Sequence, residues 1–142
     1  MFYKCRHFAI DELVDQATFR RFGELAWQFF RPEILISIDG IRDYYSRPII
    51  VNNWHDGGPF SERGLRILND GDKAIYSPYS AHPMGAAVDL DVEGVPAEEV
   101  RQTILAHKDE DAFKLINRLE KGTNWVHADV FNVENRIVVF SG

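Results

Sequence analysis

A histidine and an aspartate lie seven residues apart in the stretch SAHPMGAAVD, and both are of types that bind metal ions. A metal ion needs its ligands to converge within about 2.0–2.2 Å of it. An extended strand of seven residues spans roughly 23 Å, so the chain must turn back if His82 and Asp89 are to reach one ion. Gly85 can adopt the backbone conformation of such a turn, and the alanines after it let the backbone pass close to the site.

A third candidate ligand lies far downstream, in the stretch NWVHADV. The alternation of its residues predicts a strand in which Trp125, His127 and Asp129 share one face. Two histidines and one aspartate supply three ligands and leave the fourth position to water, which is typical of a catalytic rather than a structural zinc site. The sequence therefore predicts one Zn²⁺ per chain. Its expected ligands are His82, Asp89 and His127.

The pattern Ser-x-His-x-x-Gly-x-Ala-x-Asp, followed by Trp-Val-His-x-Asp, resembles the M15 family of zinc peptidases. This family includes D-Ala-D-Ala carboxypeptidases and phage endolysins that cut the peptides of peptidoglycan. The resemblance covers roughly residues 8–131. It implies an α+β fold, a peptide of the bacterial cell wall as the substrate, and zinc bound by His82, Asp89 and His127.

The resemblance also singles out an arginine upstream of the histidine motif. Relatives carry a Ser-Gly-Tyr-Arg segment about fourteen residues before the serine of that motif, and Gly-Leu-Arg ending at Arg66 occupies this place. The resemblance implies that Arg66 holds a substrate carboxylate or steadies a developing oxyanion, for which a guanidinium is suited. A surface ion pair is the alternative role for Arg66, and Arg63 is its competitor.

Two further residues are candidates for contact with the substrate. Trp125 shares a strand face with His127, so it can form a wall of the cleft or belong to the core. Ser80 can fix the loop that presents His82.

The residue that takes a proton from water is the point where the chain departs from its relatives. Several branches of the family carry an acid three residues before the last histidine, and here that position is Asn124. Asp129 can act as this base or can orient an imidazole that binds the metal, and both roles stay open. The weaker base candidates are Glu62, Asp56 and Asp91.

Three interpretations follow from these residues. The first is a zinc peptidase that cuts bacterial peptidoglycan, as an endolysin or a virion-associated lysin. The second, suggested by Asn124, is a catalytically inactive structural or binding module of a phage, with virion proteins as partners. The third is a protein without zinc whose histidines are structural.

Composition limits the other possibilities. The 142 residues suit one domain, residues 1–142. The net charge of −6, with no basic stripe, argues against nucleic acid as a partner, and no apolar run approaches the roughly 20 residues of a membrane span. The first seven residues do not resemble a signal peptide. We therefore expect synthesis in the cytoplasm and delivery to the cell wall by lysis machinery or a virion.

The elements that position these residues follow from periodicity and turn signals. Apolar spacing predicts helices first, and short β-branched or alternating runs predict strands later. The result is an α+β domain with helices packed on a small, mostly antiparallel sheet, the last strand pairing antiparallel with the one before it. One or two helices are expected over residues 11–30, and one helix each over residues 32–45, 97–108 and 109–119. The expected strands cover residues 49–53, 88–92, 124–130 and 136–140.

Overall fold

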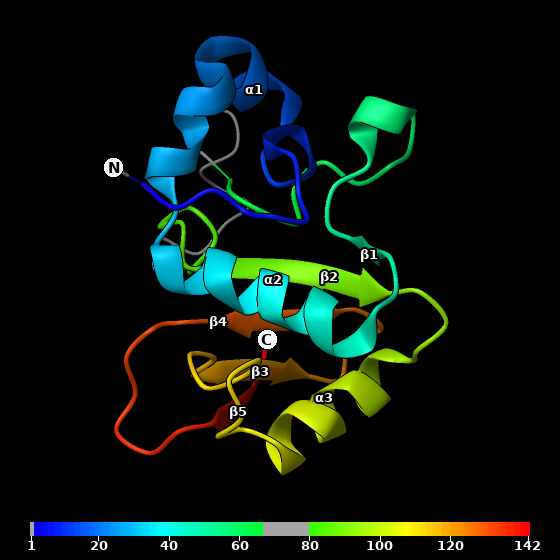
Figure 1. Ribbon diagram of the computed structural model, residues 1–142, viewed down its shortest axis with the longest axis vertical. Helices are drawn as coiled ribbons and strands as arrows, with labels where there is room; N and C mark the ends of the chain where they lie inside the picture. The colour runs from blue at the N-terminus through cyan, green and yellow to red at the C-terminus, as the bar shows by residue number, and fades with distance from the viewer. Residues whose placement is uncertain (1, 67–79) are drawn as a thin grey trace.

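The computed structural model describes residues 2–66 and 80–142, and within them the predicted α+β class is confirmed. Helices from the first half of the chain and one from the second half pack on a five-stranded sheet (Figure 1). The helical segments are α1 (Gln16–Phe22), α2 (Pro32–Tyr45), α3 (Ala97–Ala106) and the 3₁₀ turns Ile10–Glu12, Gly23–Phe29 and Trp54–Asp56. The strands are β1 (Ile49–Ile50), β2 (Ala87–Val92), β3 (Arg118–Lys121), β4 (Val126–Asp129) and β5 (Val138–Ser141).

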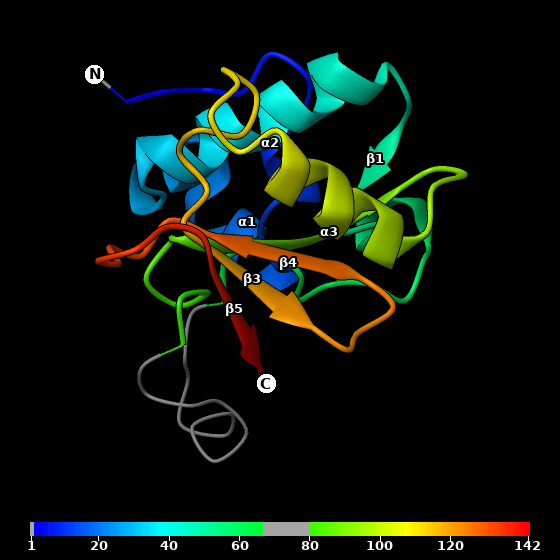
Figure 2. The ribbon, with the colours of Figure 1, turned by 90° about the horizontal axis from the view of Figure 1, so that it is seen from below.

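The sheet has the strand order β1-β2-β4-β3-β5. Its neighbours pair antiparallel except β3 and β5, which are parallel. Helices α2 and α3 cover one face of this sheet (Figure 2). The opposite face is therefore left for the polar residues of β2 and β4.

Helix α2 forms the centre of the helical layer. Pro32 occupies its first turn, where a missing backbone N–H costs nothing. The apolar residues follow at helical spacing, and each is almost completely buried, which anchors the helix on the sheet. They are Ile34, Leu35, Ile38 and Ile41.

The pairing of β2 with β4 decides which side chains meet. Asp89 lies opposite His127 and Ala87 lies opposite Asp129. Because alternate residues of a strand point to opposite faces, the buried Val88 sits on the helix-covered face while Asp89 points to the other. The register therefore brings an acid and an imidazole side by side.

The expected helix over residues 109–119 is wrong. This segment forms turns and then β3, whose Arg118 and Leu119 pair with β4. The side chains of Phe113, Ile116 and Leu119 are fully buried at a spacing of three, which resembles helical periodicity. Backbone carbonyls in this region are instead bound by the guanidinium of Arg136, which donates to the carbonyls of Phe113 and Ile116 at 2.7 and 2.9 Å.

Two strand predictions also need correction. The last strand pairs parallel with β3 and not antiparallel with β4, because β3 occupies the edge of β4 that the prediction had assigned to it. The first strand is shorter than expected and ends at Ile50, after which the backbone of Asn52 donates to the Glu12 carbonyl. In the described part of the chain, no helix combines the length and the apolar character needed to cross a membrane.

Candidate metal centre

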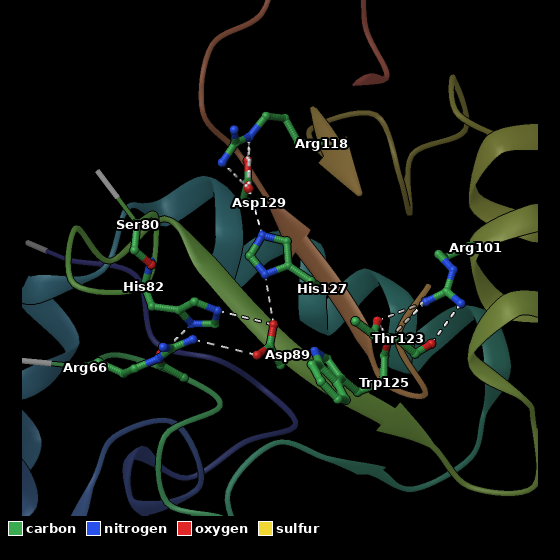
Figure 3. Close-up of polar contacts among 11 residues, drawn as sticks. Arg66, Ser80, His82, Asp89, Arg101, Arg118, Thr123, Trp125, His127 and Asp129 are labelled. Atoms are coloured by element: carbon green, nitrogen blue, oxygen red, sulfur yellow. Dashed lines mark hydrogen bonds and ion pairs between the residues drawn. The ribbon is translucent and has the colours of Figure 1, made fainter. Parts of the chain in front are cut away.

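The three predicted ligands meet on the sheet face opposite the helices. The ligand atoms of His82, Asp89 and His127 all lie within 4.8 Å of one another. All three residues are buried, with 2%, 8% and 5% of their surfaces exposed. Figure 3 shows both imidazoles directed at the Asp89 carboxylate. The protein therefore holds a buried His-Asp-His group that can bind one metal ion.

The loop before β2 brings His82 back to Asp89. Gly85 has a φ of +67°, and a Cβ at this position would overlap the carbonyl oxygen of Phe29. The turn is closed by hydrogen bonds from Gly85 N to the carbonyl of His82 at 3.1 Å and from Ala86 N to that of Ala81 at 3.0 Å. A residue without a side chain is thus required at the bend that the sequence placed there.

The two imidazoles are oriented by their outer nitrogens. Nδ1 of His82 lies 2.9 Å from the carbonyl oxygen of Gly64, so it donates a proton there and directs Nε2 at Asp89, 3.2 Å away. In His127 the roles of the nitrogens are exchanged. Its Nε2 lies 2.8 Å from Asp129 and its Nδ1 lies 2.9 Å from Asp89. Each ring therefore presents one nitrogen to the centre.

Asp129 is fixed on the far side of His127. Its carboxylate is completely buried and accepts two hydrogen bonds from Nε of Arg118, at 2.9 and 3.0 Å, and one from the backbone N–H of Phe131. The Arg118 guanidinium in turn lies over the rings of Phe131 and Phe140. This geometry places Asp129 behind the imidazole, away from the Asp89 carboxylate.

Hydrogen bonding outweighs burial in setting the charges of this group. Burial opposes charge on Asp89, but the hydrogen bonds from His127 and His82 hold the pKa of that carboxyl well below its usual range. Burial would also lower the pKa of His127, yet its hydrogen bonds to Asp129 and Asp89 raise that pKa to about 9. Asp129 follows the same logic: burial raises its pKa, and the bonds from His127 and Arg118 lower it further than burial raises it.

The spacing of the ligand atoms is close to that around a tetrahedral metal ion such as zinc. Ligands at 2.0–2.2 Å from such an ion are separated from one another by roughly 3.3–3.6 Å. Oδ1 of Asp89 lies 3.2 Å from Nε2 of His82 and 2.9 Å from Nδ1 of His127. All three ligand atoms lie within 4.8 Å of one another, and nitrogen with carboxylate oxygen is a donor set that zinc accepts.

A cavity of about 370 Å³ opens on the group. It is lined by the three ligands and, around them, by Arg66, Ser80, Arg118, Glu120, Trp125 and Phe140. A neighbouring hollow of about 350 Å³ shares Arg66, Asp89 and Trp125 with it and adds the loop of residues 59–63. Arg66 thus borders both spaces, with its guanidinium 3.8 Å from the Asp89 carboxylate.

Of the other candidate residues, only some lie close to the His-Asp-His group. Ser80 accepts a long hydrogen bond, 3.4 Å, from the backbone of His82. Asn124 is exposed on the turn before β4 and is not among the residues that line either cavity. Arg63 pairs with Asp91 at 2.7 Å, and Asp56 is exposed beside His55.

No protein-family model, no curated protein and no solved structure significantly matches this chain. The findings for the protein itself are its α+β fold and a buried His-Asp-His group that can hold one metal ion.

Three residues of the site were missed by the sequence analysis. Arg118 supports Asp129, and Glu120 lines the cavity, but Arg118 lies in a segment that was expected to be helical and Glu120 directly follows it. Arg101 on α3 is 4% exposed and donates to the backbone carbonyls of Thr123 and Trp125, each at 3.0 Å, so it holds the turn that carries Trp125. An arginine among the apolar positions of an otherwise amphipathic helix was the available signal for Arg101.

Proposed function

We propose that this chain is a zinc-dependent peptidase that hydrolyses peptide bonds of bacterial peptidoglycan, as an endolysin or a virion-associated lysin. The observation that carries the proposal is the convergence of His82, Asp89 and His127 at the floor of an open cavity bordered by an arginine. The motif resemblance to the M15 family supplies the substrate class. Delivery by lysis machinery or a virion belongs to the same proposal.

Zinc held by two imidazoles and a carboxylate polarises a carbonyl and lowers the pKa of water. The chain supplies the remaining requirements. Arg66, on the cavity wall, is placed to bind a carboxylate of the substrate or the developing oxyanion. Trp125 lines both hollows.

Asp129 serves in this proposal as a positioning residue. Its oxygens are already occupied by Arg118, His127 and the Phe131 backbone. A carboxylate that accepts from the outer nitrogen of a ligand histidine fixes the ring and raises its basicity. Of the two roles left open by the sequence, orientation of His127 is the one that this hydrogen bonding supports.

A second candidate function is a catalytically inactive module that keeps the fold and the metal, as a phage structural component with virion proteins as partners. The specific observation in its favour is Asn124, which cannot accept a proton and lies exposed outside the cavity. On this interpretation the chain binds zinc and does not cleave peptides.

The two candidates are separated by one combined experiment. The purified chain is analysed for bound zinc, and the zinc-loaded protein is incubated with peptidoglycan, whose fragments are identified by mass spectrometry. The proposal expects one zinc per chain and new peptide termini. Zinc without new termini would leave the inactive module, and the absence of zinc would exclude both.

Matched histidine variants assign the metal to the site. His82→Ala should lose the zinc and the cleavage together. His107, which is exposed and pairs with Glu110 at the end of α3, provides the control. His107→Ala should keep both properties.

A further inference from the structure

Hydrolysis of a peptide bond requires a group that accepts a proton from the attacking water, and carboxylates commonly do this. The carboxylates predicted for this role are mostly occupied elsewhere. Asp129 is bound by Arg118 and His127 behind the imidazole. Asp91 forms an ion pair with Arg63 at 2.7 Å.

Glu120 has the placement that those carboxylates lack. It lies on β3 two residues after Arg118, so both side chains point to the sheet face that carries His127. Its side chain is half-buried and lines the same cavity as all three ligands. Among the described residues, its carboxylate takes part in no hydrogen bond and no ion pair.

The neighbouring strand limits where this carboxylate can go. Glu120 is paired with Phe140 of the parallel strand β5, and Phe140 also lines the cavity. A Cβ placed on Gly142 would overlap Oε1 of Glu120, so the carboxylate already lies against the backbone at the end of β5. The acid is thus held at the rim of the cavity, with its charge not committed to another group that the structure describes.

We infer that Glu120 is the general base of the proposed peptidase, an inference that rests on the proposed function. A Glu120 oxygen takes one proton from the attacking water as the water oxygen bonds to the peptide carbonyl carbon. The C–N bond then breaks, and Glu120 returns the proton to the leaving amine. The products are one amine and one carboxylic acid, which keeps the second proton of the water and then loses it to the amine or to solvent, and the Glu120 carboxylate is regenerated.

Glu62 is the competing carboxylate. It lines the neighbouring hollow with Arg66 and Asp89, but its side chain is exposed to solvent. The hollow that contains Glu62 includes only Asp89 of the three ligands, whereas the cavity that contains Glu120 includes all three. The geometry therefore favours Glu120.

The test compares Glu120→Gln with Glu62→Gln and with Glu134→Gln, an exposed glutamate in the turn before β5. Zinc affinity is measured by competition with a chelator, folding by thermal unfolding, and turnover by release of peptide termini from peptidoglycan. Glu120→Gln should bind zinc within about twofold of wild type and lose about 100- to 10,000-fold in turnover. Glu62→Gln should lose less than about tenfold, and Glu134→Gln should behave as wild type.

Each other outcome overturns the inference in a recognisable way. Turnover retained in Glu120→Gln excludes Glu120 as the base while wild-type cleavage leaves the peptidase intact. A zinc affinity that falls about tenfold or more in Glu120→Gln makes Glu120 part of the metal site, as a ligand or as the support of a ligand, and overturns its assignment as the base. If zinc-loaded wild type does not cleave, the proposed function fails and the inference fails with it. Should the glutamine variant not fold, Glu120→Ser is measured under the same criteria.

Discussion

The Nε2 nitrogen of His127 lies 2.8 Å from Oδ2 of Asp129, on the side of the ring that faces away from Asp89 (Figure 3). The two residues are two positions apart on β4 and therefore share one face of the strand, which places the carboxylate behind the imidazole. With Nε2–H donated to Asp129, Nδ1 is the nitrogen left for a metal. The ion pair between the partly exposed Arg118 and the buried Asp129 thus orients a ligand from outside the centre.

Asp129→Asn should weaken zinc binding by about 10- to 100-fold, because the amide is a poorer acceptor for the His127 N–H. The measurement is competition between the protein and a chromophoric chelator. Urea unfolding of the metal-free variant is measured in parallel, since Arg118 loses a charged partner.

Asp91→Asn is the matched control for this change. Asp91 belongs to β2 and pairs with Arg63, without a hydrogen bond to either ligand histidine. The zinc affinity of the Asp91→Asn variant should stay within about twofold of wild type. Equal losses in both variants would show that general charge, and not the bond to His127, accounts for the effect.

The turn at Gly85 supplies a stability prediction. Gly85→Ala should lower the free energy of unfolding by about 2–5 kcal/mol, combining the cost of a positive φ with overlap against the Phe29 carbonyl. Urea unfolding of the metal-free protein measures it.

Gly122 separates the two contributions. Its φ is +85°, close to that of Gly85, but no atom of the described residues lies within 4 Å of a Cβ built there. Gly122→Ala should therefore cost only about 1–2 kcal/mol. If both variants lose the same stability, contact between Gly85 and the Phe29 carbonyl does not constrain the His82 loop.

The three ligands could be predicted from the sequence because short-range patterns determine their positions. Alternation placed His127 and Asp129 on one strand face, and the glycine between His82 and Asp89 marked the turn that joins them. The antiparallel register of β2 and β4 then places Asp89 beside His127.

The residues around the ligands could not be predicted from the sequence, because their positions depend on contacts between distant parts of the chain. The period of the buried residues Phe113, Ile116 and Leu119 indicates a helix. Hydrogen bonds from Arg136 to nearby carbonyls and the pairing of β3 with β4 and β5 stabilise another conformation. Arg118 and Glu120 reach the site only through that pairing, which no local pattern specifies.

Arg101 should contribute to stability through the turn that carries Trp125. Arg101→Met keeps the apolar stem and removes the donors to the carbonyls of Thr123 and Trp125. We expect a loss of about 1.5–3 kcal/mol in the free energy of unfolding, measured with urea. The exposed neighbour Gln102 donates a side-chain hydrogen bond to Glu98 on the helix surface, so Gln102→Ala should stay within about 0.5 kcal/mol of wild type. Equal losses would exclude a special role for the buried guanidinium.

Arg66 lies between the two hollows, and kinetics of Arg66→Gln distinguish its two proposed roles. If its guanidinium binds a substrate carboxylate in the ground state, KM should rise by about 10-fold or more, corresponding to a lost charged hydrogen bond. If it steadies an oxyanion, kcat should fall instead, by about 100-fold. Zinc stoichiometry should remain at one per chain in either case.

Arg63→Gln should have the smaller effect, because Arg63 is already paired with Asp91 and stacked on Phe60 at 3.8 Å. Wild-type kinetics in Arg66→Gln would exclude both proposed roles of Arg66 in catalysis.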